Sequence, residues 1–218
     1  GAGDDQFAVD AIDPVTSVTL NLGNGNDHVD VTAMEGNLTI NGGAGDDTVT
    51  AGSLAPALTG GMMAGVAGAL SFSGDAGSDT LNIDDTAVSS GSQAVLTGST
   101  LSGLGMGLGV TSYTIDTLNI RLGDYDDLVE VQGTSAATHI WGNGGDDVFD
   151  VSSDGASLAG TLDNVLGLLD IDAGAGGNTL SVSDLGDTDA DVAVLTDSAL
   201  TGLAPAAINF AATGGRFT

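Results

Sequence analysis

The chain has 218 residues, enough for one or two domains, and its formal net charge at pH 7 is −28. Thirty acidic residues stand against two arginines and no lysine, which excludes binding to nucleic acid or to an anionic membrane surface. Hydrophobic residues make up 41% of the chain, more than an acidic disordered protein contains, so we expect it to fold.

Glycine is abundant, with 36 residues against three prolines, and cysteine is absent. This composition excludes collagen and disulfide-stapled scaffolds and favours a fold with a glycine turn every few residues. The chain starts at Gly1 without a visible signal peptide, so we expect a mature product or a piece of a longer protein. The most apolar stretch, 55–72, is broken by glycines, and we therefore predict no membrane insertion.

One glycine-rich pattern occurs seven times, and each copy runs from a glycine cluster through an aspartate, or an asparagine in the last copy, into alternating apolar residues. The key positions are Asp5, Asp27, Asp47, Asp79, Asp127, Asp147 and Asn178, separated by steps of 22, 20, 32, 48, 20 and 31 residues. The steps 20 and 32 therefore recur as 20 and 31. Repeats at a fixed period are the signature of solenoid folds.

A longer period contains these steps, because VLTGSTLSGL at 95–104 returns as VLTDSALTGL at 194–203. The sequence therefore predicts a rung of about 20 residues inside a duplicated unit of about 100 residues. We place the two units at approximately 1–115 and 116–218, with the second incomplete, as expected for a segment of a longer tandem array.

Within a rung, Val29 and Val31 share one strand face, residues 34–37 form a turn, and Leu38 and Ile40 resume the inward face. Two short strands and two turns would make one coil, and stacked coils lie about 4.8 Å apart. Because one coil buries little, its neighbours must supply the core. We predict an all-β parallel β-solenoid, a β-roll or right-handed β-helix, continuous over 1–218, with extra or looped-out coils in the long steps.

Residues 42–50, GGAGDDTVT, match every specified position of G-G-x-G-x-D-x-U-x, a calcium-binding β-helix signature. The chain thus resembles the repeats-in-toxin (RTX) family and, more loosely, the repeats of very large bacterial surface proteins. The resemblance implies Ca²⁺ between successive turns, bound by aspartate carboxylates and glycine carbonyls. The implied ligands are Asp5, Asp27, Asp47, Asp79, Asp127 and Asp147, with Gly1, Gly3, Gly23, Gly25, Gly43, Gly45, Gly123 and Gly145.

The chain departs from the family pattern in two ways. The motif recurs about every 20 residues instead of every nine, so only one edge of the solenoid would carry metal. Tyr125 and Asp75 replace glycines, and Asn178 replaces the aspartate, which weakens the prediction for the sites near 79, 127 and 178.

Charge repulsion gives an independent reason to expect a cation. Asp27 and Asp47 would stack about 5 Å apart and repel by roughly 3 kcal/mol at an effective dielectric of 20. Calcium prefers six to eight oxygen ligands, and an affinity of about 10⁻⁴–10⁻³ M suits an extracellular module whose folding depends on the metal. The alternative is a calcium-free glycine turn with solvated aspartates.

Other candidate sites are weaker. Residues 187–191 begin like an EF-hand loop, but Val192 and Ser198 stand where glycine and glutamate are needed, so we interpret the segment as an acidic surface loop. His28 and His139 should face outward without binding zinc. Trp141, also outward, either anchors an interface or is an isolated surface aromatic.

These features predict a structural protein and no enzyme, because the carboxylates follow the repeat instead of gathering in a cleft. We expect a calcium-binding module of an extracellular bacterial surface protein, adhesin, surface layer or filament. It would self-associate end to end or laterally, or continue as a tandem array, and a cell-surface glycan stays open as a partner. The alternative is a non-catalytic calcium-binding module of a secreted polysaccharide-modifying or proteolytic enzyme; an intact β-helical glycan-active enzyme is a weaker third reading.

Overall fold

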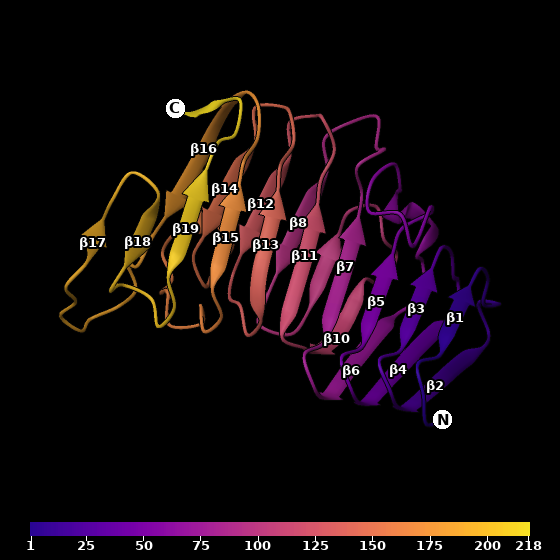
Figure 1. The fold of residues 1–218 in the computed structure, drawn as a ribbon. Helices are drawn as coiled ribbons and strands as arrows, with labels where there is room; N and C mark the ends of the chain where they lie inside the picture. Colours follow the sequence, from indigo (N-terminus) through magenta and orange to yellow (C-terminus); the bar gives the residue numbers. More distant parts are fainter. The chain divides into compact units, whose positions relative to one another are not determined.

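The computed structural model describes residues 1–218, and nearly all of its regular secondary structure is β-strand (Figure 1). The chain divides into two compact units: unit 1 is Gly1–Val88 with Ser99–Arg121, and unit 2 is Ser89–Gly98 with Leu122–Thr218. The only helices are two three-residue 3₁₀ turns, η1 (Met63–Gly65) and η2 (Gly155–Ser157), and no helix has the length and hydropathy needed to cross a bilayer. The all-β prediction is confirmed.

The strands of unit 1 lie in two rows, ordered β1-β3-β5-β7-β11 and β2-β4-β6-β10-β9. Most neighbouring strands pair in parallel one step apart, so that His28 lies opposite Thr48 and Thr48 opposite Thr80. The strands are β1 (Gln6–Val9), β2 (Ser17–Asn24), β3 (His28–Val31), β4 (Asn37–Ala44), β5 (Thr48–Ala51), β6 (Leu70–Ala76), β7 (Thr80–Asp84), β9 (Leu101–Gly103), β10 (Val110–Thr114) and β11 (Thr117–Arg121).

The strands of unit 2 also lie in two rows, ordered β8-β12-β14-β16-β20 and β13-β15-β19-β18-β17. Parallel pairing again follows the repeat, with Val129 opposite Phe149 and Phe149 opposite Leu180. The strands are β8 (Gln93–Leu96), β12 (Leu128–Val131), β13 (Ala137–Trp141), β14 (Val148–Val151), β15 (Leu169–Asp172), β16 (Gly177–Val182), β17 (Val194–Leu195), β18 (Ala199–Thr201), β19 (Ile208–Ala211) and β20 (Arg216–Phe217).

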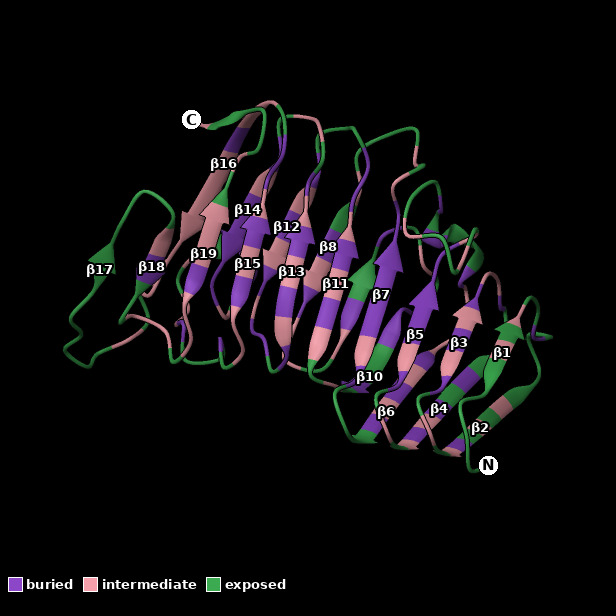
Figure 2. Ribbon diagram, in the orientation of Figure 1, coloured by how far each residue is buried: buried purple, intermediate pink, exposed green.

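The core of each unit consists of the alternate apolar residues that the strand pattern predicted. Val29, Val31, Leu38 and Ile40 are at most 1% exposed, and the buried positions recur along the neighbouring strands (Figure 2). Branched side chains suit such columns, since each residue packs against its equivalent on the adjacent strand. One detail differs, because Met34, expected in a turn, is 1% exposed and forms an isolated bridge with Val66.

Antiparallel strands, which the sequence did not predict, occur in the step between Asp79 and Asp127 and in the residues after Asn178. In unit 1, β9 pairs antiparallel with β10, and in unit 2, β17 pairs with β18 and β18 with β19 in the same manner. The duplicated segments 95–104 and 194–203 supply parts of these strands. The inserted residues therefore form short meanders beside the parallel strands.

Candidate metal site on the aspartate ladders

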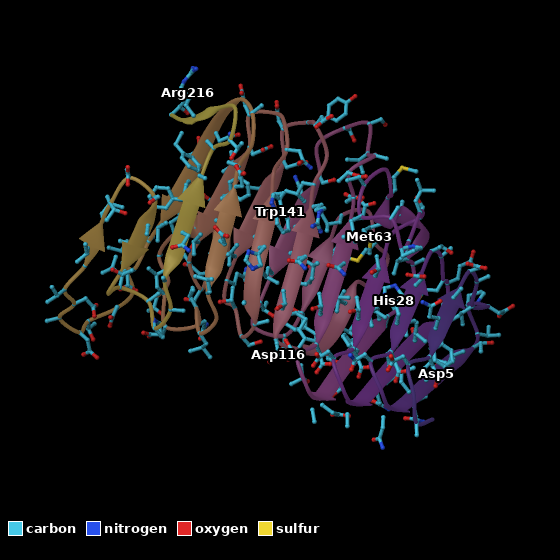
Figure 3. All side chains as sticks on the ribbon, in the orientation of Figure 1. Asp5, His28, Met63, Asp116, Trp141 and Arg216 are labelled. Carbon is cyan, nitrogen blue, oxygen red and sulfur yellow. The ribbon has the colours of Figure 1, made fainter.

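The repeated aspartates lie in the turns, each one residue before a strand. Asp27 and Asp47 precede β3 and β5, and Asp147 precedes β14. All of the repeated aspartates except Asp5 are at most 2% exposed, namely Asp27, Asp47, Asp79, Asp127 and Asp147. Asp5, labelled in Figure 3, is exposed. Burial of so many carboxyl groups requires a compensating interaction.

Backbone hydrogen bonds provide the first compensation. The Asp27 amide donates to Asp47 Oδ1 at 2.8 Å, and the Asp47 amide donates to Asp79 Oδ1 at 2.9 Å. In unit 2 the Asp127 amide donates to Asp147 Oδ1 at 2.9 Å. We call these rows the aspartate ladders: Asp5, Asp27, Asp47, Asp79 and Asp116 in unit 1, and Ser92, Asp127, Asp147 and Asn178 in unit 2.

The residue before each ladder position forms a second row of hydrogen bonds. In this row the amide of the later turn donates to a side chain of the earlier turn, which is the reverse of the first row. The Asp46 amide donates to Asn26 Oδ1 at 2.9 Å, and the Ser78 amide donates to Asp46 Oδ1 at 2.9 Å. Each pair of adjacent turns is therefore linked in both directions by two consecutive residues. The acidic doublets at 4–5, 46–47, 126–127 and 146–147 are the sequence signal for this arrangement, and the sequence reasoning used only their second member.

Glycine is required five residues before a buried aspartate. A Cβ at Gly42 would lie 2.2 Å from Asp47 Oδ2 and 2.8 Å from the Gly74 carbonyl oxygen. At Gly142 the corresponding distances are 2.4 Å to Asp147 Oδ2 and 2.7 Å to the carbonyl oxygen of Ala173. A carboxylate oxygen and a carbonyl oxygen thus approach the same space in both units.

Most of the glycines whose carbonyl oxygens were predicted to bind metal have a positive φ angle. Gly43 and Gly45 have φ angles of 111° and 131°, a region that favours glycine, and so do Gly3, Gly23, Gly25 and Gly145. Gly1 and Gly123 do not belong to this set. These glycines permit the tight turns, whereas the space beside the buried carboxylates is opened by Gly42, Gly74 and Gly142, which the sequence prediction omitted.

Three of the ladder aspartates bury an Oδ2 atom that lacks a hydrogen bond of the kind that Oδ1 accepts. Oδ2 of Asp27, Asp47 and Asp147 is buried without a hydrogen-bond partner. Asn178 occupies the next ladder position, and its Nδ2 donates to the Gly174 carbonyl, four residues earlier, at 3.4 Å. An aspartate in the same conformation would direct an oxygen, instead of this N–H donor, toward a carbonyl oxygen. A proton or a cation would remove that conflict.

Burial also changes the acidity of the ladder. Desolvation raises the pKa of Asp47 and of Asp79, and neighbouring carboxylates raise both further. Burial, followed by the charges of Asp127, Asp126 and Asp146, raises the pKa of Asp147 to about 7. The protonated form and a cation-bound form therefore compete near neutral pH.

The donor set fits a hard divalent cation. Calcium takes carboxylate and backbone carbonyl oxygens in irregular geometry, and both kinds border the buried Oδ2 atoms of Asp47 and Asp147. No histidine or sulfur ligand takes part, so the chemistry is that of an oxygen-only site. Each ladder could thus hold a cation that links adjacent turns.

Other polar groups gather outside the ladders. Oxygens of Asp184, Asp187 and Asp191 lie within 4.8 Å of one another, so the segment interpreted as an acidic loop brings carboxylates together in a set that excludes Asp189. His28 Nε2 lies 2.7 Å from Asp30 Oδ1. These groups are partly or fully exposed, unlike the buried carboxylates of the ladders.

The aromatic pair on unit 2 lies on β13, where Trp141 is labelled in Figure 3. His139 and Trp141 stack with ring centroids 5.8 Å apart, and His139 Nδ1 lies 3.2 Å from Asp170 Oδ2. Trp141 is half-buried by these neighbours.

Comparison of the chain with protein-family models, curated proteins and solved structures finds no match.

Proposed function

We propose that this chain is a calcium-binding structural module of an extracellular bacterial surface protein, such as an adhesin, a surface layer or a filament. Its fold would be a parallel β-solenoid of the RTX kind, in which coils of about 20 residues stack along one axis. The parallel register of β1 with β3 and of β3 with β5, at steps of 22 and 20 residues, supports this fold.

The observation that carries the proposal is the contrast between Asn178 and the aspartates. Asn178 satisfies the ladder with a donor toward Gly174, whereas Asp47 and Asp147 bury Oδ2 without any donor. Uncompensated burial of a charge is unfavourable, so these positions need a cation or a proton. Calcium is the cation of choice, because the surrounding ligands are hard oxygens in irregular turns.

Calcium would act through folding. Each ion would neutralise ladder carboxylates on one edge of the sheet stack and join turns that are far apart in sequence. With 30 acidic residues and two arginines, the chain has few internal cations of its own. Metal binding would thus contribute directly to the free energy of unfolding, and the chain would be loose where calcium is scarce.

A structural role also agrees with the distribution of the acidic groups. The ladder carboxylates are spread one per turn, and their Oδ1 atoms are engaged by backbone amides. Glycan hydrolysis instead requires two carboxyl groups flanking one scissile bond. The proposal therefore assigns the acids to stability and not to catalysis.

End-to-end association would follow from the edges of unit 2. Strand β8 contains Val95-Leu96 and is covered by the parallel strand β12, whereas β17, with the matching Val194-Leu195, is the outer strand of its sheet. Leu195 is 71% exposed and borders an apolar cavity of about 320 Å³ with Phe210. We propose that a strand of β12 type, from another repeat copy, covers this edge.

Calcium titration with matched variants tests the proposal. Asp47→Asn and Asp147→Asn keep the acceptor for the neighbouring amide, as Asn178 does, but remove the charge. By isothermal titration calorimetry each variant should lose the calcium-binding step of its own ladder site, while circular dichroism in chelator stays like that of the unaltered chain. Calcium binding unaffected by both substitutions would refute the ladder as the metal site.

A further inference from the structure

One outer strand of unit 2 is uncovered, although its duplicate in the same unit is covered. Val194-Leu195 of β17 repeats Val95-Leu96 of β8. Leu96 is 0% exposed in a strand that pairs with β12, whereas Leu195 is 71% exposed in a strand that pairs only with β18 (Figure 1). The pairing of β8 with β12 therefore shows which kind of strand fits the open side of β17.

The open side of β17 is apolar. Val192, Val194 and Leu195 are each more than half exposed, and an apolar cavity of about 320 Å³ borders the strand. The cavity is lined by Leu180, Val182, Leu195, Leu200, Phe210 and Phe217. Such an edge favours the addition of a strand, because a new partner satisfies its backbone groups and buries its side chains.

The equivalence of β8 and β17 extends to the aspartate ladder. The Ser92 amide, one residue before β8, donates to Asp127 Oδ1 at 2.6 Å. Asp191 is the repeat equivalent of Ser92, since each lies four residues before the leucine of the duplicated Val-Leu pair. No acceptor in the chain receives the Asp191 amide. A strand that covers β17 as β12 covers β8 therefore brings a carboxylate to this amide.

Strand β1 carries the motif that precedes β12. Residues 1–9, GAGDDQFAV, match residues 123–131, GDYDDLVEV, at the first glycine, at both aspartates and at the last valine, so Asp5 corresponds to Asp127. The Asp5 amide donates to Asp27 Oδ1 at 2.7 Å, but no amide donates to the Asp5 carboxylate. The ladder of unit 1 therefore begins with an acceptor that is still available.

β1 also has an open side. It pairs only with β3, whereas β12 pairs with both β8 and β14. Phe7 and Val9 are half-buried, whereas the matching residues Val129 and Val131 are fully buried. β1 thus lacks the neighbour that β12 finds in β8, and β17 is the uncovered duplicate of that neighbour.

We propose that β1 of one copy of the chain pairs in parallel with β17 of a second copy, in the register that β12 adopts with β8. The copies are then joined head to tail. This assignment deepens the end-to-end association of the proposed function and rests on it. Val131 lies opposite Leu96 in the covered edge, and Val9 therefore lies opposite Leu195 in the joined copies.

The contact satisfies the free groups on both strands. The Asp191 amide donates to the Asp5 carboxylate, so it starts a ladder as Ser92 starts the ladder of unit 2. Phe7 lies opposite Ala193, whose small side chain leaves space for the aromatic ring. The open sides of β1 and β17 become a continuous pair of strands, and the apolar residues on both are removed from water.

Disulfide trapping between two different variants tests the register. The chain has no cysteine, and the exposed residues Ala8 and Val194 lie opposite each other in the joined copies. Paired strands lie about 4.8 Å apart, within reach of a disulfide. Ala8→Cys mixed with Val194→Cys under mild oxidation should therefore give a disulfide-linked dimer on a non-reducing gel. Either variant alone should give little dimer, and so should Ala8→Cys mixed with Leu166→Cys, a control at another exposed residue of unit 2.

Sedimentation velocity tests the apolar contact without a cross-link. The net charge of −28 opposes association, so the chain is compared over a concentration series at about 0.15 M salt, where the Debye length is about 8 Å. Leu195→Lys should weaken self-association by about tenfold or more, because the contact would bury the ammonium group. Leu166→Lys introduces the same charge away from β17 and should leave association unchanged.

The outcomes separate this contact from the metal site. Dimer that forms only from Ala8→Cys with Val194→Cys supports the head-to-tail pairing. Equal dimer yields in all mixtures, or self-association that Leu195→Lys leaves unchanged, overturn it. These variants keep every ladder carboxylate, so calorimetric calcium titration of the same proteins tests the proposed function separately. A chain that forms the specific dimer but takes up no calcium refutes the metal site and keeps the contact.

Discussion

The turn at Asp79 in unit 1 and the turn at Asn178 in unit 2 have the same backbone connections and opposite electrostatics. Each side chain accepts the amide of the preceding ladder residue, Asp47 or Asp147, at 2.9 Å. Asn178 then uses its Nδ2 to donate to Gly174, while Asp79 has no equivalent donor. The ladder geometry therefore requires an acceptor but no charge, and the charge needs a separate explanation.

Removal of calcium should have the largest effect on the stability of the chain, because it acts on the charged aspartates and not on Asn178. If three ladder aspartates bind calcium at ten times their Kd, they contribute about 4 kcal/mol, equivalent to roughly 8–16 °C in Tm. Calorimetric melting with calcium and with chelator measures the difference. Equal Tm values in the two conditions would break the link between the aspartates and the metal.

Substitution of a ladder acceptor should come next. Asp47→Ala removes the acceptor of the Asp27 amide, and an unsatisfied buried amide costs about 1–3 kcal/mol. In chelator, Asp47→Asn should be as stable as the unaltered chain or more stable, because the amide keeps the acceptor without a buried charge. Urea denaturation of both variants in chelator compares them, and equal destabilisation by alanine and asparagine would contradict the acceptor role.

Raising the pH should destabilise the calcium-free chain. Because the folded pKa of Asp147 is raised from 3.8 to about 7, its contribution to stability is complete below pH 3.8 and is lost as pH rises through 7. The unfolding midpoint in chelator should therefore fall between pH 4 and pH 7.5 by more in the unaltered chain than in Asp147→Asn.

With calcium present the dependence should reverse, since the metal binds the deprotonated carboxylate and its affinity rises over the same interval. Identical pH profiles for the unaltered chain and for Asp147→Asn, with and without calcium, would show that Asp147 does not titrate in this range.

The smallest expected effect comes from converting unit 2 toward unit 1. Asn178→Asp removes the hydrogen bond to Gly174 and places an acceptor against it, so the chelated protein should lose about 1 kcal/mol. Added calcium should restore that loss. Thermal melts of this variant in both conditions provide the measurement, and a loss that calcium leaves unchanged would weaken the equivalence of the two turns.

The sequence was most informative where one physical pattern repeats. Strict alternation around Val29 and Val31, with glycine turns about 20 residues apart, predicted the parallel pairing of β3 with β5 and the buried columns. That inference is strong because a strand face must be apolar to be buried, and equal spacing places like residues in register.

The antiparallel meanders and the ladder bonds could not be predicted in the same way. β9 and β10 lie in the 48-residue step, where no period fixes the register. The bonds from Asp46 to Asn26 and from Asp27 to Asp47 depend on turn geometry that only the folded chain defines. Asp116 follows no motif, so its position beside Asp79 required the structure.

The most direct measurement is anomalous diffraction at long wavelength from crystals grown in millimolar calcium. The account predicts calcium peaks beside Oδ2 of Asp47 and Asp147, and no peak beside the side chain of Asn178. Well-ordered ladders in which no calcium peak lies beside either aspartate would contradict it.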